Sequence, residues 1–176
     1  MIVRPQRGSD DAAVSAVLLD AFGEQRVVDL AAALLARPDA PGVAFVAEDA
    51  DAIVGHVQLS RSWLDAPQRL VQVLVLSPFG VAPPRQRQGI GRALAAAAVD
   101  AARQLAAPAV FLEGDPAYYT KLGWQPASEY GVTAPSSRIP QPALQVMILA
   151  AWRPEMAGAL VYNDTFWAHD CVGLRP

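Results

Sequence analysis

The chain has 176 residues and a formal net charge of −3, and 53% of its residues are hydrophobic against 18% that are charged. This length predicts one domain, and this apolar content suffices to bury a full hydrophobic core without disulfides or metals. The composition excludes a disordered tail, a polybasic nucleic-acid binder and a disulfide-stapled secreted module.

The first half of the chain predicts one short strand, two helices and a hairpin. Ile2–Arg4 is an apolar start followed by a proline, which is typical of an edge strand. The spacing of apolar residues predicts helices over Asp11–Phe22 and Glu24–Ala36. Alternating apolar residues then predict paired strands over Val43–Glu48 and Ile53–Leu59.

The second half predicts four strands and two helices, followed by a C-terminal extension. Leu70–Val81 is the most strand-like run, and Pro78 and Gly80 predict irregular pairing in its second half. The element order, β-α-α-β-β-β-α-β-α-β-β, predicts a mixed α/β fold rather than a doubly wound sheet. The other predicted segments are a helix over Gly89–Ala107, a strand over Ala109–Leu112, a helix over Pro116–Leu122, a weak strand near Tyr130, a strand over Leu144–Ala151, and the extension Arg153–Pro176.

The cysteine content and the lengths of the apolar runs indicate the cellular compartment. The single cysteine, Cys171, cannot form an internal disulfide, and no Cys/His cluster has the spacing of a zinc site. The chain turns polar directly after its first few residues, and no apolar run reaches the length of a membrane span. We therefore expect a cytoplasmic protein with no metal, no nucleic-acid partner and no membrane contact.

The segment from Val81 to Leu94 has the composition of an anion site. A predicted strand ends, a short turn follows, and Gly89 and Gly91 open the long helix. Unpaired N–H groups and the positive end of the helix dipole favour a phosphate at such a helix start, and glycines let it approach the backbone. Three arginines, Arg85, Arg87 and Arg92, supply further charged donors nearby.

Two common phosphate-binding motifs do not fit this turn. A Walker loop requires Gly-Lys-Ser/Thr, but Arg92 and Ala93 follow Gly91. A dinucleotide fingerprint requires a glycine or alanine three residues after its second glycine, where this chain has Leu94.

A third pattern fits. Gln86-Arg87-Gln88-Gly89-Ile90-Gly91 matches Gln/Arg-x-x-Gly-x-Gly/Ala, and the block Gly114-Asp115-Pro116-Ala117-Tyr118-Tyr119-Thr120-Lys121-Leu122-Gly123-Trp124 follows it. Together the two blocks resemble the GNAT superfamily of N-acetyltransferases, in particular a bacterial branch with Gly-Asp-Pro-x-Tyr-Tyr. The resemblance implies a mixed, mostly antiparallel central sheet flanked by helices, one domain over residues 1–176, and residues 153–176 packed on or near it.

The resemblance also implies a reaction and its participants. Acetyl-CoA would be the cosubstrate, and a small-molecule or peptide amine would attack the thioester directly. Because members of this family often form homodimers, the resemblance also implies a homodimer. A GNAT-fold sensor or interaction module that binds acyl-CoA without transferring the acyl group is the alternative.

By the same resemblance, Tyr119 takes the position of the general acid that protonates the CoA thiolate, and Tyr118 is a cofactor contact. The main chain of Phe79 and Val81 would contact pantetheine and the acetyl carbonyl. The full predicted cofactor-binding set is Phe79, Gly80, Val81, Gln86, Arg87, Gln88, Gly89, Ile90, Gly91, Arg92 and Tyr118.

The general base stays open. Many relatives carry a glutamate on the fourth strand, whereas this strand offers only Gln72, which cannot titrate. His56 titrates in the right range and Glu24 begins the second helix, so either is a candidate base. A water relay, or an amine that arrives already neutral, is the other solution.

Overall fold

The computed structural model describes residues 1–37 and 42–173. The chain divides into two compact units: unit 1 is Met1–Ser60 with Leu76–Ala101, and unit 2 is Arg61–Val75 with Ala102–Pro176. The divisions fall inside two strands and one helix rather than in linkers. The last three residues of the predicted extension, 174–176, lie outside the described residues.

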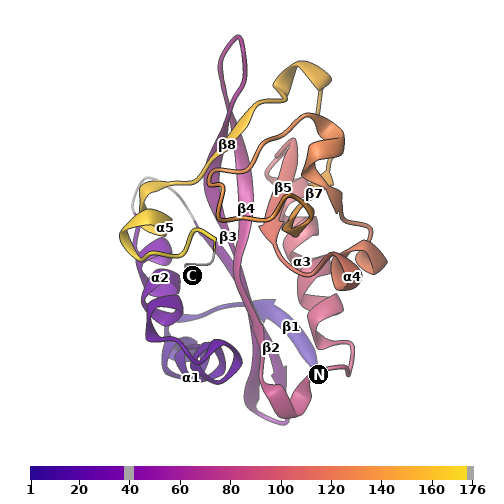
Figure 1. Ribbon diagram of the computed structural model, residues 1–176. Helices are drawn as coiled ribbons and strands as arrows, with labels where there is room; N and C mark the ends of the chain where they lie inside the picture. The colour runs from indigo at the N-terminus through magenta and orange to yellow at the C-terminus, as the bar shows by residue number, and fades with distance from the viewer. Residues whose placement is uncertain (38–41, 174–176) are drawn as a thin grey trace. The chain divides into compact units, whose positions relative to one another are not determined.

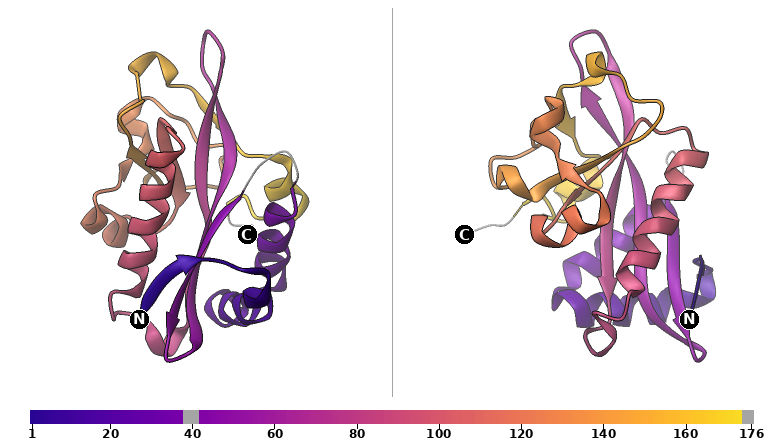
Figure 2. Two further views of the ribbon diagram at one scale, coloured as in Figure 1. Left: turned by 180° about the vertical axis from the view of Figure 1, so that it is seen from behind. Right: turned by 90° about the vertical axis from the view of Figure 1, so that its right-hand side faces the viewer.

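Unit 1 is an antiparallel sheet with helices on both faces (Figure 1). Strand β1 pairs antiparallel with β2, and β2 pairs antiparallel with the first part of β3, which lies next to β4 in the strand order. Helices α1 and α2 lie on one side of these strands and α3 lies on the other (Figures 1 and 2). The elements that contribute to unit 1 are β1 (Ile2–Pro5), α1 (Asp11–Phe22), α2 (Gln25–Leu35), β2 (Val43–Asp49), β3 (Ala52–Asp65), β4 (Leu70–Val81) and α3 (Ile90–Gln104).

Two glycines let the helices approach this sheet closely. A Cβ on Gly55 of β3 would lie 2.8 Å from Leu94 Cδ1 of α3, so any side chain at this position would have to displace Leu94. A Cβ on Gly80 of β4 would lie 3.3 Å from Leu18 Cδ2 of α1. Gly55 therefore faces α3, and the next residue on β3, His56, faces α1 and α2 because strand side chains alternate.

A partly buried ion-pair network joins β1 to the start of α1. The Arg4 guanidinium donates to Asp10 Oδ2 at 2.7 Å and to Glu48 Oε2 at 2.6 Å, and the Arg7 backbone N–H donates to Asp10 Oδ2 at 2.7 Å. These bonds favour the ionised carboxylate, and the hydrogen bond from Arg4 is the main reason that the pKa of Asp10 is lowered to about 2.

This network predicts the acid response of the fold. The pKa of Asp10 is depressed in the folded state. Its contribution to the free energy of unfolding is therefore fully present above pH 3.8, the ordinary pKa of the group, and is lost as the pH falls through about 2. We expect the free energy of unfolding to drop by about 2 kcal/mol more in the wild type than in Asp10→Asn between pH 5 and 2. Urea titrations at each pH measure this, and parallel pH curves would contradict it.

Unit 2 carries the parallel pairing of the fold. Strand β4 pairs in parallel with β5 at Leu74–Val110 and Val75–Phe111, β5 pairs antiparallel with β7, and β7 pairs antiparallel with β6. Strand β8 pairs antiparallel with β3 at Trp63–Val161. The elements of unit 2 not yet named are β5 (Ala109–Glu113), α4 (Pro116–Tyr119), β6 (Gln125–Pro126), β7 (Leu144–Ile148), β8 (Ala159–Val161) and α5 (Asp164–Ala168).

The predicted fold class and element order are confirmed, with one local error. The expected strand near Tyr130 is wrong: Ala127–Tyr130 is a 3₁₀ helix, and the short strand β6 precedes it. The helical turn ends at Gly131, whose φ of 70° is left-handed and whose N–H donates to Ser128 O at 3.1 Å. The predicted C-terminal extension supplies β8 and α5.

Candidate functional site

The turn before α3 has the geometry of an open anion site. Gly89 has a φ of 84°, which is left-handed and favours glycine, and Arg87 has a φ of 60°. Residues 86–89 are exposed, whereas Ile90, the first residue of α3, is buried and anchors the turn. The N–H groups of the first helical turn lack intrahelical partners, so they and the helix dipole favour an anion here.

The arginines of this turn differ in their surroundings. Arg87 and Arg92 are exposed and stand on either side of Gly89 in the chain. Arg85 instead forms an ion pair with Asp49 of β2, and its Nε donates to Gln88 Oε1 at 3.3 Å. The expected cluster of three arginines therefore contains one whose charge a carboxylate already neutralises.

The end of β4 is tied both to β3 and to the turn. The Ala82 N–H donates to Val54 O at 3.0 Å, and Gln86 Nε2 donates to Val81 O at 3.1 Å. Gly80 is buried and Phe79 and Val81 are half-buried. Unit 1 thus brings together the predicted cofactor contacts from Phe79 to Arg92, while Tyr118 and Tyr119 belong to unit 2.

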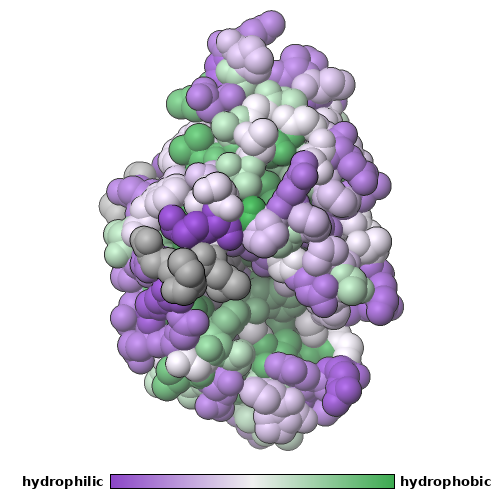
Figure 3. Space-filling model, viewed as in Figure 1, coloured by the Kyte–Doolittle hydropathy of each residue, from purple (hydrophilic) through white to green (hydrophobic). Residues whose placement is uncertain are grey.

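The last turn of α1 exposes apolar surface. Leu19 and Phe22 are both 43% exposed, although both are large and hydrophobic. Figure 3 shows apolar surface in the lower half of the view, where Figure 1 places α1. This turn leads through Gly23 into the start of α2 at Gln25.

The two candidate bases lie in contrasting environments. His56 is 0% exposed, and burial lowers its pKa to about 4, so its imidazole is uncharged at neutral pH. Glu24 lies on the surface directly before α2 and forms an ion pair with Arg26. Gln72, at the strand-four position discussed above, is exposed.

A row of buried polar side chains on β3 was not predicted from the sequence. Gln58, Ser60 and Ser62 follow His56 at alternate positions, each is at most 2% exposed, and each has a side-chain atom with no hydrogen-bond partner among the described residues. Such alternation places polar groups on one face of a buried strand. The alternating pattern His-x-Gln-x-Ser-x-Ser in the sequence could have indicated this polar face.

In unit 2, aromatic packing fixes Tyr119. Its ring meets Trp124 edge-on with centroids 6.0 Å apart, and it meets Tyr118 edge-on at 5.0 Å. Trp124 is 1% exposed, so the Tyr119 ring rests against the core of this unit. Burial and the neighbouring Tyr118 raise the pKa of Tyr119, so its phenol keeps its proton at neutral pH.

Gly114 makes room for the Tyr119 ring. A Cβ at this position would lie 2.2 Å from Tyr119 Cε2, so Gly114→Ala must displace the ring. We expect Gly114→Ala to reduce the free energy of unfolding by about 1–3 kcal/mol, as overpacking does. Gly8→Ala is the matched control, because a Cβ there meets no atom within 4 Å. Equal urea midpoints for the two variants would contradict the prediction.

Two further observations concern metal ligands and helix length. In the part of the chain that the structure describes, no group of three or more His, Cys, Asp or Glu residues could hold a metal ion. Over those same residues, every helix is too short or too polar to cross a bilayer.

Comparisons with known proteins identify the family of this chain and agree with its fold. The profile of the acetyltransferase (GNAT) family matches residues 13–124. The uncharacterized N-acetyltransferase YjhQ of Escherichia coli K12 is 30% identical over 129 residues, which are 72% of this chain and 71% of that protein. The chain belongs to the acetyltransferase (GNAT) family.

Solved structures share the fold over almost the whole chain. The GNAT family N-acetyltransferase YhbS of Escherichia coli, in complex with CoA, superposes with a TM-score of 0.83 at 23% identity, covering 94% of this chain and 91% of that one. A GNAT family acetyltransferase of Brucella melitensis, in complex with acetyl-CoA, superposes with a TM-score of 0.75 at 24% identity. The match covers 94% of this chain and 97% of that one.

Proposed function

We propose that this protein transfers the acetyl group of acetyl-CoA to a primary amine. The observation that carries the proposal is the exposed turn at residues 86–89, with its left-handed Gly89 at the start of α3, in a chain of the acetyltransferase (GNAT) family. Arg87 and Arg92 supply two exposed guanidinium groups to the pyrophosphate at this turn. The complexes of the two solved relatives with CoA and acetyl-CoA support the choice of cosubstrate.

The reaction needs one bond formed and one broken at the thioester carbon. The neutral amine attacks this carbon, its carbonyl becomes an oxyanion, and collapse forms the amide and releases CoA thiolate. The amine loses one proton to solvent, the thiolate takes one proton from the Tyr119 phenol, and solvent returns one proton to the resulting phenolate. Backbone N–H groups at the end of β4, at Phe79 or Val81, are the proposed donors to the oxyanion.

The structure favours a reaction without a strong side-chain base. The low pKa of His56 makes it a weak proton acceptor, and Glu24 is engaged by Arg26. An amine that loses its proton to water before attack therefore fits the chain better than either residue. The cytoplasmic location and the homodimer stay predictions.

Ligand binding and turnover test the proposal separately. Saturating acetyl-CoA should raise the unfolding temperature, since a ligand at one hundred times its Kd stabilises by about 2.7 kcal/mol. Free thiol should then appear over a panel of primary amines. No stabilisation by acetyl-CoA or CoA would end the proposal.

A sensor that binds acyl-CoA without transfer is the second candidate. Gln72 favours it, because this strand offers an amide where relatives carry a carboxylate. Stabilisation by acetyl-CoA with no thiol release for any amine would select the sensor, whereas amine-dependent release selects the transferase.

A further inference from the structure

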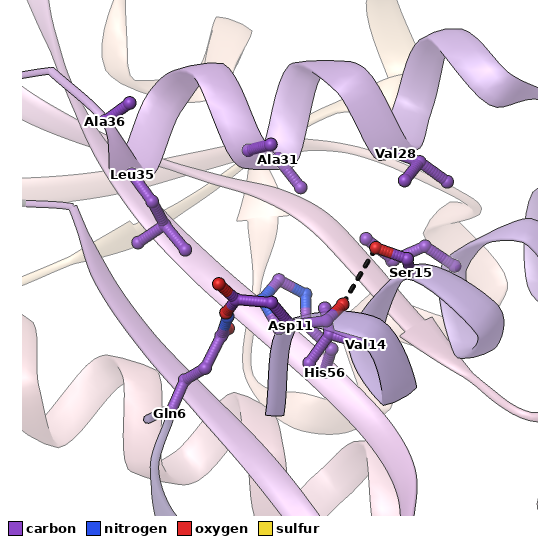
Figure 4. Close-up of a pocket in the computed structure, with 11 residues that line it drawn as sticks. Gln6, Asp11, Val14, Ser15, Val28, Ala31, Leu35, Ala36 and His56 are labelled. Carbon is purple, nitrogen blue, oxygen red and sulfur yellow. Dashed lines mark hydrogen bonds between the residues drawn. The ribbon is translucent and has the colours of Figure 1, made fainter. Parts of the chain in front are cut away.

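A cavity of about 310 Å³ lies in unit 1 between α1, α2 and β3 (Figure 4). Its volume corresponds to about ten water molecules, so a small organic molecule fits. The lining residues outside the sheet include the range from Asp11 to Leu18 in α1 and the range from Val28 to Ala36 in α2 and its C-cap. It is therefore distinct from the glycine turn before α3 and from the junction of the two helices at residues 22–26.

The strand side of the cavity is formed by a buried histidine. His56 is 0% exposed, and neither ring nitrogen has a hydrogen-bond partner among the described residues. A neutral imidazole has one N–H donor and one acceptor nitrogen. Because burial keeps this ring uncharged, it can accept a hydrogen bond from a cation without repelling it.

Two more acceptors line the same cavity. Gln6 Nε2 donates to Asp11 Oδ1 at 2.9 Å, which leaves Gln6 Oε1 buried and without a partner among the described residues. Figure 4 draws His56, Gln6 and Asp11 toward the same end of the cavity. Asp11 is the one charged residue in the described lining, so the cavity carries a negative charge at this end.

The rest of the wall is apolar. Val14, Val28 and Leu35 are among its side chains, and the small side chains of Ala31 and Ala32 leave the space open. Such a wall suits a short hydrocarbon body, because a cavity lined by aliphatic side chains gains from excluding water.

We propose that this cavity binds a small primary amine with an aliphatic body. An ammonium group has three N–H donors, which match the free nitrogen of His56, Oε1 of Gln6 and the carboxylate of Asp11. The hydrocarbon chain then lies against the aliphatic wall. The binding is independent of acetyl transfer, so it holds whether the amine is an acceptor or an effector.

The two histidines of the chain give a direct test with the whole protein. In a sample with isotope-labelled histidine, hexylamine should shift the imidazole resonances of His56 saturably. His169, which ends α5 in unit 2, should stay unshifted and serves as an internal reference. Hexan-1-ol and hexanoate have the same chain length without the ammonium group, and we expect both to bind at least tenfold more weakly.

Matched variants assign the site. Ala32→Leu fills the cavity from α2 and should abolish the His56 shift, while Ala33→Leu, one residue further and outside the lining, should preserve it. Asp11→Asn should weaken hexylamine binding about threefold, as loss of a partly exposed ion pair does. Unchanged His169 resonances show that unit 2 is folded in each variant, and a wild-type urea midpoint shows that the whole chain is.

Three results would overturn the proposal: no His56 shift with hexylamine, equal shifts with hexan-1-ol or hexanoate, or equal sensitivity of the two alanine variants. Addition of acetyl-CoA then distinguishes an acceptor amine from an effector amine. Formation of N-hexylacetamide that is blocked by Ala32→Leu identifies an acceptor, and binding without product identifies an effector. Failure of the transferase reaction therefore leaves the binding result standing.

Discussion

Gly89→Val is expected to weaken acetyl-CoA binding at least tenfold with a small loss of stability. The φ of 84° at this position is unfavourable for any residue with a Cβ, and a β-branched side chain is worse. A Cβ there would meet no protein atom within 4 Å, so the new side chain projects into the space that the pyrophosphate would occupy. A tenfold loss corresponds to about 1.4 kcal/mol, which calorimetric titration with CoA resolves.

Gly23→Val is the matched control for this experiment. Gly23 ends α1 with a φ of 71°, and a Cβ there also meets no atom within 4 Å. Both substitutions therefore strain the backbone alike, but only the one at residue 89 changes the turn before α3. If both variants bind CoA like the wild type, the phosphate site is elsewhere.

Tyr119→Phe is expected to lower kcat about a hundredfold and to leave the KM for acetyl-CoA nearly unchanged. The loss follows from removing a proton donor, because general acids contribute about 10²–10⁴ to a rate. The phenylalanine ring can keep the edge contacts with Trp124 and Tyr118 and the fit over Gly114, so folding should be preserved. Thiol release under saturating acetyl-CoA measures kcat.

Tyr130→Phe controls for the loss of a phenol in the same unit. The Tyr130 hydroxyl donates to Gln125 Oε1, and its ring packs edge-on against Trp152. We expect this variant to turn over at the wild-type rate. A wild-type rate for Tyr119→Phe would end the acid role, and equal losses in both variants would indicate a structural effect instead.

Local features of the site were predictable because short-range chain geometry decides them. The spacing of Gly89 and Gly91 predicts a strand-to-helix turn, and the structure has Gly89 left-handed directly before α3. The strand predicted near Tyr130 failed for a related reason. The few apolar residues near Tyr130 are weak evidence for a strand. Between Pro126 and Gly131 the chain forms 3₁₀ hydrogen bonds instead.

Long-range features could not be predicted from one sequence. The pairing of Arg85 with Asp49 joins residues 36 positions apart, and it removes one charge from the expected cluster. The close approach at Gly55 comes from Leu94 on another element. The burial of His56 depends on α1 and α2 covering its face of β3, so its low pKa also follows only from the tertiary structure.

The division of the chain constrains how it can be dissected. The covalent chain passes between the units at Ser60–Arg61, Val75–Leu76 and Ala101–Ala102, each within a regular element. A single cut therefore yields no fragment that contains one unit alone: a piece ending at residue 101 still includes residues 61–75. Expression of truncated pieces should give incomplete sheets, and split-protein designs should place their break in the loop between β3 and β4 or after α3 rather than between the units.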